Sequence, residues 1–417
     1  MTAVTSFERT VMPESLQGIK VIDCDTHFVE PGDLWTSRAP ARLKDRVPHL
    51  VRVGDADQWF LEDKPLGEIS VMCVGKGREK RHDVFTMERF LDIEPASYEP
   101  KARVQLMDDM GVHAQIVYPN AAGFGGNTFG AQMPEDLRTW CVTTYNDAVA
   151  EWASAAPDRL FPQALVPFWD VNAATKEAQR IAELGLSGIA ASNSPHSFPG
   201  TPDYGSREWD PFWEVCSELE LPISFHVGSG IMVGEGAPDY AWHSLLPQGI
   251  DPSDRKAIQK IGDRGMLPTV IANPSGALEN VKTISNLIFS GILDRYPKLQ
   301  FFSVESGIGW VPFFLEYAEY SFDEMAGPQH FGLQRRPTEY FRDHIHVSWW
   351  FEKFGPSKAV EDIGVKNILF ESDFPHPVCL YPTPVARAGE VLADQPYEVR
   401  KRIMETNAAE MWKIPVD

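Results

Sequence analysis

Short apolar runs recur along the chain, and stretches with a helical pattern of polar and charged residues separate most of them. The apolar runs predict eight strands, at Ile19–Asp25, His113–Pro119, Arg159–Pro167, Leu186–Ser192, Leu221–Val227, Leu299–Glu305, His344–Trp350 and Lys366–Ser372. Helical patterns cover Lys101–Gly111, Asn172–Leu184, Pro211–Leu219 and Gly276–Leu293. This alternation is typical of parallel strands that are joined by helical crossovers.

The number of strands favours one α/β domain over residues 1–417, a (β/α)8 TIM barrel. The alternative is a doubly wound open sheet with a second domain, but no dinucleotide-binding glycine motif follows the first strand. Residues 31–100 break the alternation and are rich in proline and charge, so we interpret them as a cap inserted after the first strand over the mouth of the barrel. The long stretch at about 228–274, rich in glycine and proline, is interpreted as a lid or binding loop.

Charge narrows the choice of partners. The 417 residues carry 38 basic and 59 acidic side chains, which gives a formal net charge of −21. We therefore expect neither nucleic acid nor a membrane surface as a partner, whereas a small-molecule substrate remains open. The five cysteines are widely spaced and form no CxxC motif, and no signal peptide or membrane-spanning run is visible. These features predict a cytoplasmic protein without a disulfide framework.

The candidate chemistry lies where the predicted strands end, because functional residues of such barrels gather at the C-terminal ends of the strands. The polar side chains at these ends are Asp25, His27, His226, Glu305, His346 and Asp373, with His376 just beyond. Asp25 and His27 are two positions apart, so in a strand they point to the same face. Mixed nitrogen and oxygen donors suit a divalent ion, with zinc or manganese expected and iron possible.

Each of these residues also has a structural interpretation. Asp25 could cap a turn, and His226 could be a hydrogen-bonded histidine at a strand end. Asp373 precedes Phe374 and Pro375, a sequence that also favours a turn. Their joint occurrence at the ends of the first, fifth and eighth strands favours the metal site.

Several motifs occur together in a specific order. They are VIDCDTHFVEP at 21–31, GLSGIAA at 185–191, LPISFHVG at 221–228, GILDRYPKLQFFSVESGIGWVP at 291–312 and NILFESDFPHP at 367–377. In these motifs the chain resembles the amidohydrolase superfamily, and within it the amidohydrolase-2 branch that includes aminocarboxymuconate-semialdehyde decarboxylase and γ-resorcylate decarboxylase. The resemblance implies a (β/α)8 barrel with a divalent metal at its C-terminal mouth. Its ligands would be Asp25, His27, His226 and Asp373.

The chain departs from the family pattern at two positions. Many members carry His-x-His on the first strand, where this chain has Asp25 and His27. Decarboxylases of the branch usually carry a catalytic histidine on the sixth strand, where the matching residue is Glu305. Glu305 could be a general acid or base whose pKa burial raises, or a further metal ligand. His346 is the nearest spare imidazole for catalysis, and Asp373 could take a proton from water.

The residues and the resemblance together predict a metal-dependent lyase or hydrolase that acts on a small organic, possibly aromatic, acid in the manner of a decarboxylase. A second hypothesis is an oxygen-activating monooxygenase component with a dinuclear iron or manganese centre on the same barrel. A third is a non-catalytic subunit of a hetero-oligomer. A homo-oligomer is expected, because family members often form dimers.

Overall fold

A computed structural model describes residues 9–68, 71–82, 84, 86–230, 267–326 and 331–416. All eight predicted strands are present. They are β1 (Ile22–His27), β7 (Ala114–Tyr118), β8 (Leu160–Pro162) with β9 (Ala164–Leu165), β10 (Ile189–Ala191), β11 (Ile223–His226), β12 (Phe301–Val304), β13 (Ile345–Trp349) and β14 (Ile368–Phe370). Their residues are almost all buried, which explains why they read as continuous apolar runs rather than as alternating ones.

These strands follow one another in a ring of parallel pairs. β1, β7 and β8 form one sheet, and β9 to β14 form another. The third predicted strand belongs to both, because its first half pairs with β7 and its second half with β10. At the opposite seam Thr26 bridges Phe374 in parallel, and the amide of Asp373 donates to the carbonyl of Asp25 over 2.9 Å. The predicted (β/α)8 barrel is therefore confirmed.

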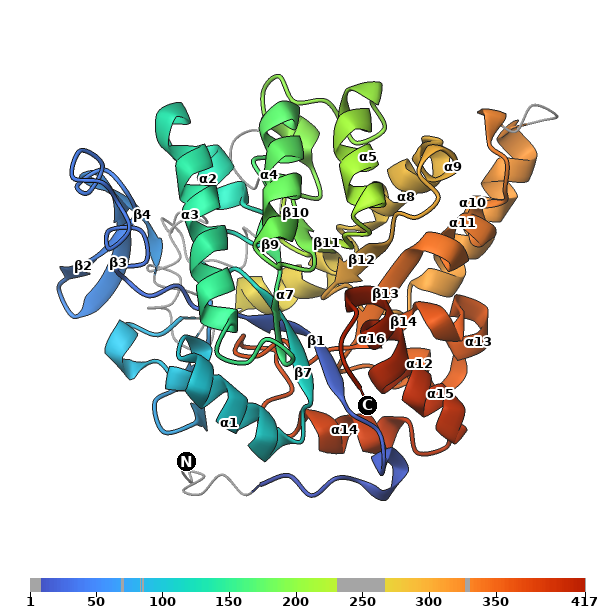
Figure 1. The fold of residues 1–417 in the computed structure, drawn as a ribbon. Coiled ribbons are helices and arrows are strands. Elements are labelled where there is room, and N and C mark those ends of the chain that lie inside the picture. Colours follow the sequence, from blue (N-terminus) through green and yellow to red (C-terminus); the bar gives the residue numbers. More distant parts are fainter. Residues whose placement is uncertain are drawn as a thin grey trace.

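Helices surround the strands (Figure 1). The longer ones are α1 (Pro100–Met110), α3 (Glu135–Ala153), α4 (Val171–Glu183), α5 (Asp210–Glu218), α7 (Leu267–Gly276), α8 (Val281–Phe289), α10 (Val311–Ala326), α11 (Pro337–His344) and α14 (Pro384–Val391). Short helices complete the set: α2 (Asn127–Gln132), α9 (Ile292–Arg295), α12 (Phe354–Lys358), α13 (Val360–Ile363), α15 (Tyr397–Lys401) and α16 (Asn407–Trp412). Within the described ranges, no helix has the length and apolar character needed to cross a bilayer.

The insertion after β1 has a sheet of its own. β2 (His49–Val53), β3 (Ala56–Leu61) and β4 (Lys64–Glu68) pair in antiparallel fashion and stand at one edge of the molecule (Figure 1). β5 (Val74–Gly75) and β6 (Glu79–Lys80) form a second, two-stranded sheet.

This insertion also contacts the barrel. The amide of Cys73 donates to the carbonyl of Pro375 over 3.0 Å, so part of the insertion lies against the loop after β14. Its role as a cap stays a prediction. Most of the second predicted lid, residues 231–266, lies outside the described residues.

Candidate metal centre

The barrel brings together five of the six predicted site residues. Asp25 and His27 lie on β1, His226 ends β11, Glu305 follows β12 and Asp373 lies beyond β14. Asp25, His27, His226 and Asp373 have no exposed surface, whereas the side chain of Glu305 keeps 19% of its surface exposed. All five therefore gather at the C-terminal ends of the strands, as parallel barrel geometry requires.

The donor atoms of four of these residues converge. His27 Nε2 lies 3.4 Å from Asp25 Oδ1 and 3.5 Å from Asp373 Oδ1. His226 Nε2 lies 3.4 Å from Asp25 Oδ2 and 3.2 Å from His27 Nε2. Two sets of three residues bring one donor atom each to within 4.8 Å of one another, namely Asp25, His27, His226 and His27, Asp373, His376.

Backbone carbonyls set the tautomers of both histidines. His27 Nδ1 lies 3.0 Å from the carbonyl of Pro119, and His226 Nδ1 lies 2.6 Å from that of Val227. A carbonyl only accepts, so each Nδ1 carries the hydrogen and each Nε2 keeps its lone pair. The two Nε2 lone pairs thus face each other and the carboxyl groups of Asp25 and Asp373, and neither imidazole places a proton between them. A cation would turn this repulsive arrangement into an attractive one.

The carboxylates support the same conclusion. Both oxygens of Asp25 and Oδ2 of Asp373 are buried without a hydrogen-bond partner. Asp373 Oδ1 lies 2.7 Å from His376 Nδ1. A buried carboxylate that is neither paired nor hydrogen-bonded costs several kcal/mol, and coordination of a metal is one of the few ways to offset that cost. In donor type and in charge, a divalent ion therefore fits the four converging side chains, which are Asp25, His27, His226 and Asp373.

Burial controls the protonation of the cluster. It raises the pKa of Asp25 well above its usual value, and the negative charges of Asp373 and Glu305 raise it further. Burial likewise raises the pKa of Asp373, and it lowers the pKa of His27. The pKa of Glu305 rises to about 7, first through desolvation and then through the charge of Asp373. Bound metal would oppose the rise at its ligands, because it favours their deprotonated forms.

The loop that carries Asp373 is tied to the first strand. The amide and the hydroxyl of Ser372 donate to the two oxygens of Asp23 over 2.8 and 2.6 Å. Asp373 itself has a φ of 60°, a left-handed conformation that is uncommon outside glycine. His376 stacks on His27 with 3.7 Å between ring centroids. The bonds to Asp23 therefore hold in place a backbone that is strained at a candidate ligand.

Glu305 stands beside the cluster rather than within it. Its Oε2 lies 3.7 Å from His226 Nδ1, and its amide donates to Glu371 Oε2 over 3.2 Å. Glu371 is fully buried and its Oε1 has no hydrogen-bond partner. Sequence reasoning missed Glu371, because it follows an apolar strand without any polar pattern.

His346 corrects our prediction, because the structure does not bring it to the cluster. It lies near the start of β13, at the opposite end of the barrel strands, and its Nε2 is 3.0 Å from Gln300 Oε1. Burial lowers its pKa to about 4. The sequence did not show which face of the strand His346 occupies, or that it lies near the strand's start. Its face and its position along the strand both keep it away from the site.

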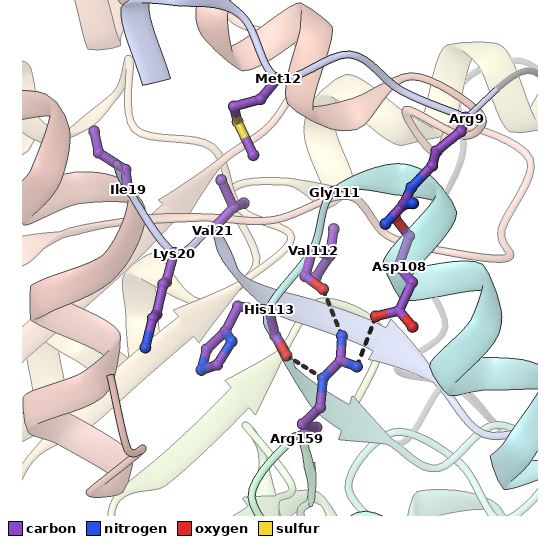
Figure 2. Close-up of a pocket in the computed structure, with 10 residues that line it drawn as sticks. All are labelled: Arg9, Met12, Ile19, Lys20, Val21, Asp108, Gly111, Val112, His113 and Arg159. Carbon is purple, nitrogen blue, oxygen red and sulfur yellow. Dashed lines mark hydrogen bonds and ion pairs between the residues drawn. The ribbon is translucent and has the colours of Figure 1, made fainter. Parts of the chain in front are cut away.

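A surface pocket also lies away from the cluster. It is lined by Ile19, Lys20, Val21, Val112, His113 and Arg159, which precede their strands, and by residues of the N-terminal segment and α1 (Figure 2). Arg159 is fully engaged there, because it donates to Asp108 and to the carbonyls of Val112 and His113. The pocket is therefore at the N-terminal end of the barrel and does not belong to the candidate metal centre.

One aromatic residue at the cluster was missed in the sequence. Phe124, in the loop after β7, has its ring centroid 4.4 Å from that of His226, 4.9 Å from that of His27 and 5.4 Å from that of His376. The available signal was the run Gly123-Phe124-Gly125-Gly126, which begins four residues after the end of a predicted strand. Such a glycine-rich turn marks a backbone that approaches another segment closely.

Comparison with known proteins gives a family model, a relative and two similar solved structures. A family model described as "Amidohydrolase" matches residues 22–414. The γ-resorcylate decarboxylase of Rhizobium radiobacter is 26% identical over 292 residues, which cover 69% of this chain and 78% of the relative.

Among solved structures, an amidohydrolase from Mycobacterium avium subsp. paratuberculosis aligns with a TM-score of 0.69 and 21% identity, over 95% of this chain and 99% of that one. A dihydroxybenzoic acid decarboxylase from Polaromonas sp. JS666 with bound manganese and an inhibitor, 2-nitroresorcinol, aligns with a TM-score of 0.58 and 18% identity, over 96% and 98%. At these identities the two structures show that the fold is shared.

Proposed function

The chain belongs to the amidohydrolase family, and from this membership we propose that it is a metal-dependent carboxy-lyase acting on a small aromatic acid. The observation that carries the proposal is the buried Asp25 carboxylate, which faces two histidine lone pairs and has no hydrogen-bond partner. The γ-resorcylate decarboxylase relative supports the choice of reaction. An aromatic acid also agrees with a site that holds Phe124 beside three imidazoles.

We assign the metal to Asp25, His27, His226 and Asp373. Two carboxylates with two imidazoles suit manganese, which the Polaromonas structure contains, and zinc is the alternative. When bound, such an ion polarises an oxygen of the substrate and neutralises its negative charge. His376 orients Asp373 through its Nδ1 and keeps the ring of His27 in place by stacking.

Glu305 is the proposed proton donor. Burial raises its pKa and so favours the protonated form that a donor needs, and its partial exposure lets it reach a bound acid. In decarboxylation the bond between the ring carbon and the carboxylate breaks, carbon dioxide leaves, and the electron pair stays on the carbon. That carbon takes the proton of Glu305. In a hydrolase the same site would instead use Asp373 to accept a proton from water.

The test is carbon dioxide release from hydroxybenzoates, including 2,6-dihydroxybenzoate, by the manganese-loaded enzyme. Glu305→Gln removes the proton donor and should lower kcat about 100-fold or more, with the metal retained. Asp373→Asn should lose metal and activity together. Hydrolysis of an ester or amide without carbon dioxide release would contradict the lyase proposal, and so would an unchanged kcat in Glu305→Gln.

A second candidate function is the oxygenase, because Glu305 adds a carboxylate beside His226 and the buried carboxylate of Glu371 accepts the amide of Glu305. Two iron ions per chain and oxygen consumption would support that hypothesis over a lyase. Self-association into a homo-oligomer remains a prediction, and sedimentation or light scattering would measure it.

A further inference from the structure

We propose that Phe124 is the specificity-determining residue of this site, an aromatic wall against which the planar ring of the substrate packs. The inference rests on the proposed function, because it names the feature by which the site would choose an aromatic acid over a saturated one.

The backbone around Phe124 requires glycine on both sides. Gly123 and Gly126 adopt φ values of 85° and 73°, in the left-handed region that favours glycine. A Cβ on Gly125 would come within 2.6 Å of the carbonyl oxygen of Ala191, closer than real contacts allow. The loop is therefore packed directly against the end of β10. Its course places the ring of Phe124 at the cluster.

Hydrogen bonds hold this loop at both ends. The fully buried carboxylate of Glu30 accepts the amides of Asn120, Ala121 and Ala122 over 3.1, 2.8 and 3.2 Å. At the other end, Asn127 Nδ2 donates to the carbonyls of Gly228 and Gly230 over 3.2 and 2.9 Å. A loop held in this way presents Phe124 in a fixed position, so a ligand would not have to order it first.

The ring is tilted against the imidazoles rather than stacked on them. The interplanar angle is 51° with His27 and 42° with both His226 and His376. Phe124 keeps part of its surface exposed, whereas His27 and His226 beside it are fully buried. A planar ring bound at the metal would cover that surface and gain an aromatic contact.

The neighbouring aromatic side chain cannot do the same. Tyr118 lies 6.2 Å from the ring of His27 and 5.5 Å from that of His226, but it is fully buried and its hydroxyl donates to Ser224 over 3.0 Å. Of these two rings, only Phe124 retains surface that a ligand can reach.

The experiment compares the Kd values of two acids of similar size on manganese-loaded protein, measured by rapid mixing before the proposed turnover consumes either acid. One is planar 2,6-dihydroxybenzoate, and the other is saturated 2-hydroxycyclohexanecarboxylate. The wild-type protein should bind the planar acid more tightly. Phe124→Leu should reduce the ratio of the two Kd values about 3- to 10-fold, the size of one aromatic contact. Phe124→Tyr keeps the ring and should keep the ratio.

Phe314→Leu is the matched control, because Phe314 is also half-buried but lies on α10 against Trp310. Manganese content should be equal in all four proteins. An unchanged ratio in Phe124→Leu overturns the inference, and if carbon dioxide release persists the proposed function still stands. A wild-type protein that shows no preference for the planar acid, or binds neither acid, also overturns the inference. The proposed carboxy-lyase function would be contradicted only if the wild-type protein also released no carbon dioxide.

Discussion

Asp25 is the residue in which burial and charge conflict most clearly. Its carboxylate has no exposed surface and accepts no hydrogen bond, although Asp23 on the same strand is fully bonded to Ser372. Turn capping, the structural alternative that the sequence allowed for Asp25, would have shown backbone amides at its oxygens. A buried carboxylate in this state is best explained by a positive ion that it is built to bind.

Asp25→Asn should therefore have opposite effects on the metal-free and the metal-loaded protein. Without metal, the wild-type protein must either bury the Asp25 charge without a partner or take up a proton there. The substitution removes this cost and should raise the free energy of unfolding by about 1–3 kcal/mol. With metal, the affinity for manganese should fall about 100-fold or more. Denaturation in a chelator and a manganese titration measure the two effects.

Asp23→Asn is the control, and it should destabilise the metal-free protein because it disturbs the bonds to Ser372. A metal-free Asp25→Asn protein that is less stable than the wild type would contradict our interpretation of Asp25.

The shifted carboxyl groups also predict how pH acts on the metal-free protein. The pKa of Asp23 rises to about 6 and that of Glu305 to about 7, both mainly through burial. Between their unfolded and folded pKa values the folded state binds more protons than the unfolded state, so stability falls as pH rises. The lowered pKa values of His27 and His346 act with the opposite sign over an overlapping pH range, so a substitution is needed to isolate the contribution of Glu305. Relative to the wild type, metal-free Glu305→Gln should gain stability as pH rises from about 4.5 to 7. Urea unfolding of both proteins measures this, and a stability difference that does not change with pH would contradict the raised pKa of Glu305.

Sequence reasoning located most of the residues at the site but not their surroundings. Asp25, His27, His226 and Asp373 follow apolar strands, and strand ends can be read from the pattern. His346 could not be placed, because its position along its strand and its face both depend on the register of β13. Glu371 directly follows the apolar strand β14, and nothing in the sequence shows that its carboxylate lies beside the cluster.

At the scale of elements, the strands were predictable because each is buried on both faces. The break in the third strand was not predictable. There Gln163 alone separates β8, which pairs with β7, from β9, which pairs with β10. Its amide donates to the carbonyl of Val117, and the following amide of Ala164 donates to that of Gly188. Such a division depends on barrel closure, which local sequence does not encode.

The loop after β7 gives a prediction at this scale. Glu30→Gln keeps the shape of the side chain but leaves one oxygen for the three amides of residues 120–122 that the carboxylate now accepts. It should destabilise the protein by about 1–3 kcal/mol and weaken the fixed position of Phe124. Limited proteolysis should cut Glu30→Gln within 120–127 faster than the wild type. Equal cleavage rates would show that Glu30 does not hold the loop.

At the scale of the whole molecule, barrel closure creates the site. Asp23 and Ser372 bond across 349 positions of sequence, so residues near the two ends of the chain meet at one seam. The net charge of −21 is compatible with a metal site, because the carboxylates of the cluster are only a few of the 59 acidic side chains. The remaining acidic residues are consistent with a solvating surface.

Since the ion would bind only the closed barrel, metal removal should destabilise the whole molecule. Manganese at about 100 times its Kd should raise the free energy of unfolding by about 2.7 kcal/mol. Chelation should therefore lower Tm by several degrees, and added manganese should restore it. An equal fall of Tm on chelation in the wild type and in Asp373→Asn would contradict a site that includes Asp373.

The central claim is that Asp25, His27, His226 and Asp373 hold one divalent ion. The most direct test is elemental analysis of the wild type, purified without added metal, alongside Asp25→Asn and Asp373→Asn. We predict about one manganese or zinc ion per chain in the wild type and far less in both variants. Two iron ions per chain would contradict the mononuclear account in favour of the oxygenase hypothesis, and equal metal in all three proteins would contradict the assigned ligands.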